Sequence, residues 1–134
     1  MLKKTITYTD YNGVSRTEDF YFNLSKAEFI EMELGTVGGF TEMVQKIINT
    51  QDAPSLIKIF KELVLKAYGE KSADGRRFIK SEELSIAFSQ TEAYTELFTE
   101  LATNAEAAAA FINGLAPKEA VNNNGGLVEA TVKQ

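Results

Sequence analysis

The most apolar segment of this chain restricts its fold more than any other feature. Asp52-Ala53-Pro54 has the form of a helix start, with an aspartate cap and a proline in the first turn, where a missing N–H costs nothing. Apolar residues then recur at helical spacing, and burying five of them contributes on the order of 10 kcal/mol before conformational entropy is subtracted. We expect a central helix whose buried side comprises Leu56, Ile57, Phe60, Leu63, Val64 and Ala67, with Ile59 and Leu65 partly off it.

Two further helices are expected before this one. Ser25 and Glu28 have the spacing of a capping box, so a helix begins near Lys26. It ends at Gly35 and carries a broad apolar stripe comprising Ala27, Phe29, Ile30, Met32 and Leu34. Gly38-Gly39 predicts a flexible break, and apolar periodicity then predicts a second amphipathic helix from Phe40 to about Thr50.

Three more helices are expected after the central one. Ser81 starts a short helix through Phe88, and Thr91 caps the next, in which apolar residues recur at i, i+3, i+4 and i+7. Thr103 and Glu106 again have capping-box spacing, and Asn113-Gly114 predicts the end of the last helix.

Extended structure is expected only at the start of the chain. Residues 5–9 alternate threonine with large apolar residues, residues 10–13 supply an Asn-Gly turn, and a second extended run continues from Val14 to Phe22. Aromatic rings at residues 20–22 fall on both faces of that run, so helices are expected to pack on it. Residues 68–80 are polar and turn-rich, and they are predicted to form a loop with a tight turn at Asp74-Gly75.

These elements predict an α+β fold that is mostly helical, with an N-terminal β-hairpin packed on a bundle of five or six short helices. We expect one globular domain over residues 1–116, with the hairpin in 1–23 and the helices in 25–114. Residues 117–134 lose the periodicity and are predicted to form a flexible tail. Val128, Ala130 and Val132 alternate with polar residues there, which would suit a strand if a partner offered a sheet edge.

Composition excludes most familiar chemistry. The 134 residues include no cysteine and no histidine, which removes thiolate and imidazole nucleophiles, their metal ligands and any side chain that ordinarily titrates near neutral pH. No apolar run is long enough to span a membrane, and no apolar signal core follows Lys4. We therefore expect a soluble cytoplasmic protein that is not an enzyme and uses no metal or cofactor.

Charge is distributed unevenly along the chain. Residues 71–80 hold four basic residues against one acidic residue, whereas residues 81–112 hold six glutamates and no lysine or arginine. The net charge of −5 disfavours binding to nucleic acid. The acidic stretch is either a solvated face or a surface complementary to a basic partner, and the sequence leaves both interpretations open.

Two carboxylate patterns resemble functional sites, but neither has the arrangement that the site requires. Residues 70–75 begin like a calcium loop, but position 12 of such a loop is Ser81 here instead of a bidentate glutamate. Glu92 and Glu96 lie one helical turn apart on a surface face, which indicates solvation and not the facing carboxyls of a glycosidase.

The order of three segments resembles a known family. FYFNLSKAEF (Phe20 to Phe29), SLIKIFKELVLKAYGEKSADGRRFIKSEEL (Ser55 to Leu84) and FSQTEAYTELFTELATNAEAAAAFINGLAP (Phe88 to Pro117) look like the tail assembly chaperones of long-tailed, siphovirus-type phages and prophages of Gram-positive bacteria. The likeness covers about residues 3–117 and involves no catalytic motif. It implies a late, non-enzymatic factor in the host cytoplasm that binds the tape measure protein, keeps it soluble and helps tail tube subunits assemble, with tail tube protein and further copies of itself as additional candidate partners.

A binding site follows as a hypothesis. An apolar groove is expected to receive client helices, although the same residues would equally suit a core, and its members are Leu84, Phe88, Tyr94, Leu97, Phe98, Leu101 and Phe111. The alternative function is that of a structural virion component, such as a connector or tail-completion protein. A third option is an inhibitor that mimics nucleic acid through its acidic face.

Overall fold

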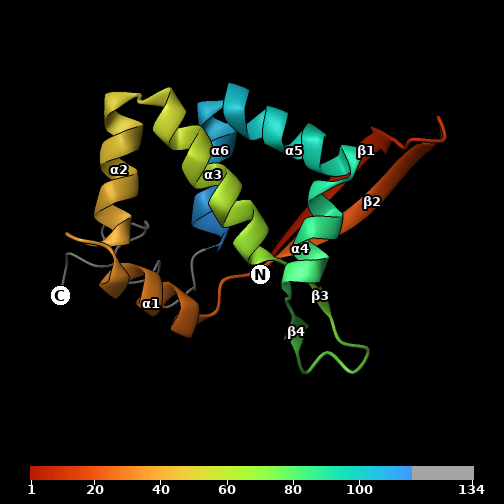
Figure 1. Cartoon of the computed structure of the whole chain (residues 1–134), viewed down its shortest axis with the longest axis horizontal. Coiled ribbons are helices and arrows are strands. Elements are labelled where there is room, and N and C mark those ends of the chain that lie inside the picture. The colour runs from red at the N-terminus through yellow and green to blue at the C-terminus, as the bar shows by residue number, and fades with distance from the viewer. Residues whose placement is uncertain (116–134) are drawn as a thin grey trace.

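The computed structural model describes residues 1–115 of the chain, and within them it confirms a mostly helical α+β fold that begins with an antiparallel β-hairpin (Figure 1). The predicted tail lies outside the described residues. The elements in chain order are β1 (Leu2–Thr9), β2 (Ser15–Phe22), α1 (Lys26–Gly35), α2 (Phe40–Thr50), α3 (Ala53–Ala67), β3 (Tyr68–Lys71), β4 (Phe78–Ile79), α4 (Glu82–Ser89), α5 (Glu92–Thr103) and α6 (Ala105–Leu115).

The β1–β2 hairpin follows from local sequence. Its register pairs Thr9 with Ser15 and Leu2 with Phe22, so β1 begins three residues earlier than the alternation at residues 5–9 predicts. In the turn, Gly13 has a φ of 81°, which a glycine adopts without strain, and the Asp10 carboxylate accepts the N–H groups of Asn12 and Val14.

The loop predicted for residues 68–80 is wrong, because these residues form a second hairpin. β3 extends the sheet by pairing Tyr68 with Phe22 and Gly69 with Tyr21, and β4 pairs with β3 to complete the sheet order β1-β2-β3-β4. An ideal Cβ at Gly69 would lie 2.6 Å from the Ile79 carbonyl oxygen, so this close strand approach requires glycine. The turn at Gly75 was predicted because its residue types mark it locally. β3 was not predicted, because it is polar and its pairing partner β2 lies about fifty residues earlier in the chain.

Most helix starts agree with the predicted caps. Ser25 and Glu28 form a complete capping box, and Asp52, Ser81 and Thr91 each accept an N–H at the start of a helix. At the start of α6 the prediction is off by one residue, since Asn104 accepts the Ala107 N–H.

Two details of the last helices differ from the predictions. Thr103, expected as a cap, remains in α5 and donates its hydroxyl to the Thr99 carbonyl. α6 continues through the predicted stop at Gly114 and ends at Leu115. An ideal Cβ at Gly114 would meet Leu2 at 3.1 Å, so the missing side chain lets α6 approach β1 closely.

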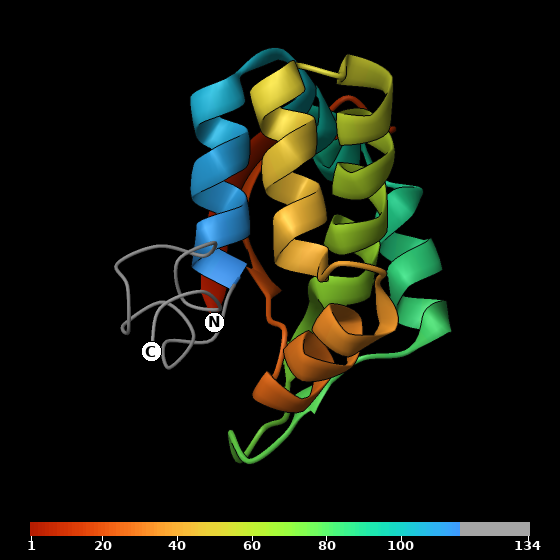
Figure 2. The same cartoon turned by 90° about the vertical axis from the view of Figure 1, so that its left-hand side faces the viewer.

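The predicted central position of α3 is confirmed. Its buried residues are Ile59, Phe60, Leu63, Val64 and Ala67. Ile57 and Ile59 are exchanged relative to the prediction, because Ile57 faces solvent and Ile59 the core. Phe22 of β2 is fully buried against Phe88 and Phe111, at ring-centroid distances of 5.8 and 5.4 Å, and joins the sheet to α4 and α6. Figure 2 shows α1 crossing beneath α2 and α3.

Candidate protein-binding surface

The outer face of α1 carries an apolar stripe that no described residue covers. Ala27, Ile30 and Leu34 lie at i, i+3 and i+7, on the side of the helix opposite the buried Phe29, and Val37 follows just after the helix. Ile30 is 45% exposed, Leu34 82%, and Val37 wholly so. We call these four residues the α1 stripe. An exposed apolar row at helical spacing is typical of a surface that receives another helix.

The N-terminal end of α1 is held firmly on the rest of the fold. Lys80, which follows β4, donates to the Glu28 carboxylate at 2.6 Å and to the Asn23 carbonyl at 2.8 Å. Burial acts to raise the pKa of Glu28, but the hydrogen bonds from Lys80 and from the Ser25 backbone outweigh it and hold that pKa below its usual value. The ionised form of Glu28 therefore anchors α1.

A second carboxylate fixes the other end of α1. Glu33 Oε1 accepts both the backbone N–H of Thr41, at 2.9 Å, and its hydroxyl, at 2.8 Å, and Thr41 is fully buried in the first turn of α2. The break predicted at Gly38-Gly39 separates the two helices as expected, and Glu33 ties them across it. The stripe is thus exposed on an anchored helix and not on a loose one.

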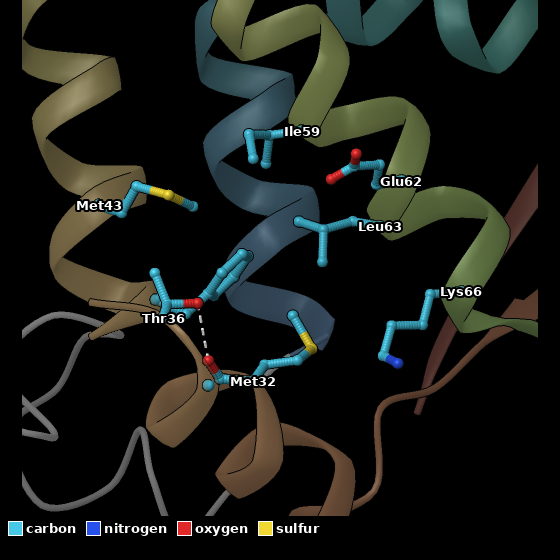
Figure 3. Close-up of a pocket in the computed structure, with 9 residues that line it drawn as sticks. Met32, Thr36, Met43, Ile59, Glu62, Leu63 and Lys66 are labelled. Atoms are coloured by element: carbon cyan, nitrogen blue, oxygen red, sulfur yellow. Dashed lines mark hydrogen bonds between the residues drawn. The ribbon is translucent and has the colours of Figure 1, made fainter. Parts of the chain in front are cut away.

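A hollow of about 310 Å³ opens beside this helix, between α1, α2 and α3. Figure 3 shows Met43 extending from α2 toward α3, and Met32 reaching from α1 toward Leu63. Glu62 and Lys66 of α3 stand at its polar side. Methionine side chains are flexible and polarisable, so such a hollow adapts to apolar side chains of different shapes.

The structure places most of the groove predicted from the sequence inside the core. Phe88, Leu97, Leu101 and Phe111 are at most 3% exposed. Leu84, Tyr94 and Phe98 are partly exposed, and the rings of Tyr94 and Phe98 stack with centroids 5.8 Å apart. A partner at the surface can reach only these last three, and their role in binding stays a prediction.

Two of the three glutamates of α5 contact residues elsewhere in the fold. Tyr11 donates its hydroxyl to Glu92 at 2.9 Å, and Lys4 pairs with Glu100 at 3.3 Å. In the basic hairpin, Asp74 accepts from Ser72 and from the Arg76 N–H, so its carboxylate serves the turn. Among residues 1–115, no three acidic side chains come close enough together to hold a metal ion.

The sequence predicted an apolar stripe on α1 but not that Ile30 and Leu34 are exposed. A ten-residue helix with five apolar residues spread beyond one face, at the edge of a small domain, cannot bury all of them. Periodicity identified the residues, but only the packing of Phe29 shows which of them face inward.

Comparison with known proteins adds one finding. The model of a family described as phage tail assembly chaperone matches residues 1–129. No curated protein and no solved structure matches the chain significantly. In the part of the chain that the structure describes, no helix has the length and apolarity to cross a membrane.

Proposed function

This chain belongs to the phage tail assembly chaperones, and we propose that it binds the tape measure protein in the host cytoplasm, keeps it soluble and promotes assembly of the tail tube around it. Family membership supports a protein-binding role in tail assembly. The observation that carries the proposal is the α1 stripe, an apolar row that no residue within 1–115 covers, held on a doubly anchored helix. Tail tube protein is the further partner that this role implies, and no catalytic step is involved.

In this proposal a helix of the tape measure protein lies along α1. Its apolar residues contact Ile30 and Leu34, and a neighbouring side chain enters the hollow between Met32 and Met43. The client helix would thereby hide apolar surface that otherwise drives aggregation. Glu62 and Lys66 form a charged rim that keeps the site soluble before the client binds.

Co-expression with the tape measure gene product tests the proposal. Ile30→Asp and Leu34→Asp should fold normally, because both side chains are exposed, and should leave the tape measure protein insoluble. Ile86→Asp is the matched control, since Ile86 is a 50%-exposed isoleucine on α4. If both α1 variants are folded and still keep the client soluble, α1 is not the binding surface.

The surface predicted from the sequence is tested in the same assay. Phe98→Asp changes a partly exposed residue of that set, whereas Leu97→Asp would disrupt the core and report nothing about binding. Loss of client solubility with Phe98→Asp but not with Leu34→Asp would move the binding surface to α5.

A further inference from the structure

A second surface with groups available for binding is the free edge of β1. β1 is the first strand in the sheet order and pairs on one side with β2, and no strand within residues 1–115 pairs with its other side. An open edge offers a row of backbone donors and acceptors to any extended chain.

The hairpin register shows which peptide groups face outward. The Asp10 N–H donates to the Val14 carbonyl at 2.9 Å, so these two residues form a hydrogen-bonded pair next to the turn. Hydrogen-bonded pairs alternate along an antiparallel ladder, so Lys4, Ile6 and Tyr8 direct their peptide groups toward β2. The N–H and C=O groups of Thr5 and Thr7 therefore point away from β2, toward the free edge.

A hollow of about 240 Å³ runs along this edge and is lined by Lys4, Thr5, Ile6, Thr7, Glu96, Leu97 and Glu100. Side chains of consecutive strand residues alternate between the two faces of a sheet. Four consecutive residues of β1 can line one hollow only if the hollow lies along the strand's edge. α5 supplies the rest of the lining, and we call this space along the edge of β1 the trough.

Two of the three charged side chains that line the trough are acidic, Glu96 and Glu100, and the third is Lys4. Glu100 pairs with Lys4, but Glu96 forms no ion pair within the described residues and is exposed. Ile6 and Leu97, which also line the trough, are buried. A lysine or arginine in an added strand would meet Glu96 with its charge and cover Leu97 with its aliphatic stem.

We propose that this edge binds an extended segment of another protein by β-strand addition, with lysine or arginine at alternate positions facing Glu96 and Glu100 and β-branched residues beside Thr5 and Thr7. A second copy of this chain is disfavoured, because edge-to-edge pairing would bring Glu96 and Glu100 of both copies together. Residues 127–133 of the same chain carry one glutamate and one lysine and so lack the positive charge.

The two surfaces are separate. α1 lies at the opposite end of the fold from α5 in both views (Figures 1 and 2). The β1 edge therefore goes beyond the proposed chaperone site, and its test uses neither the tape measure protein nor the α1 stripe.

The test is backbone amide exchange of the full chain with a short peptide of alternating threonine and lysine. The peptide should slow exchange at Thr5 and Thr7. A peptide of the same charge with proline in place of threonine should not, because proline has no N–H to donate to the ladder. Glu96→Lys should weaken binding about three- to tenfold, whereas Glu106→Lys, an exposed glutamate of α6 outside the trough, should leave it unchanged.

Three results would overturn the inference. Slow exchange at Thr5 and Thr7 in the free chain would show that the chain itself or a second copy already covers the edge. Equal binding of the proline peptide would reduce the contact to charge alone. Equal effects of Glu96→Lys and Glu106→Lys would place the contact outside the trough.

Discussion

α1 and α5 are short helices with similar apolar spacing, yet they use their apolar residues in opposite ways. α5 lies against β1, α3 and α6 and directs Leu97 and Leu101 into the core. α1 lies at the margin, packs chiefly on α2, buries Phe29 alone and turns Ile30 and Leu34 to solvent. A helix buries the apolar residues that its neighbours cover, so equal periodicity leads to a core element in one place and an exposed apolar surface in the other.

The contrast also separates stability from function. The predicted groove drew its residues from α4, α5 and α6, and four of the seven lie in the core instead. Ile30 and Leu34 of α1 lie outside the core, so replacing them should leave the protein folded. Variants on the two helices should therefore fail in different assays.

Truncating the two leucines gives the largest expected difference. Leu97→Ala should lower the free energy of unfolding by about 2–5 kcal/mol, because it leaves a cavity in the core. Leu34→Ala should change it by less than about 0.5 kcal/mol. Urea denaturation measures both values. A loss of 2 kcal/mol or more for Leu34→Ala would show that α1 is covered in solution and would end the contrast.

Removing the carboxylate at the end of α1 should have an intermediate effect. Glu33→Ala leaves the buried Thr41 hydroxyl and N–H without their acceptor, which should cost about 1–3 kcal/mol. Glu31→Ala, at an exposed position of the same helix, is the control and should cost little. Thermal unfolding of both variants compares them, and equal costs would mean that Glu33 does not anchor α1.

Breaking the ion pair at the start of α1 should have the smallest effect. Lys80→Met should cost less than about 1 kcal/mol, because the pair is partly exposed. The lowered pKa of Glu28 means that its contribution is complete above its usual value of 4.5 and is lost as the pH falls through the folded-state pKa. The difference in unfolding free energy between wild type and Lys80→Met should therefore shrink in acid. A difference that is constant from neutral pH to strongly acidic pH would exclude this role for Glu28.

Local signals were sufficient for much of the fold. Ser25, Asp52, Ser81 and Thr91 begin the expected helices because a cap satisfies backbone groups within three residues of itself. Failures occurred where distant residues intervene. The β3–β4 hairpin depends on pairing with β2, and the glycine at position 114, expected to stop α6, lies inside the helix where it packs closely against Leu2.

The candidate site shows the same division. The apolar residues of α1 and the glutamates of α5 can be found in the sequence. The sequence does not show that the α1 stripe is exposed, nor does it show the methionine-lined hollow or the trough beside β1. All three features depend on which helices and strands lie next to one another in the folded protein.

By itself the amino-acid sequence determined where helices begin, which residues are apolar and that no thiol or imidazole chemistry is available. Only the tertiary structure decided that Leu97 is buried while Leu34 is exposed, and that Glu96 and Glu100 of α5 lie beside the edge of β1. The physical reason is range: caps and turns are satisfied within a few residues, whereas burial and strand pairing depend on partners that the fold brings from far along the chain.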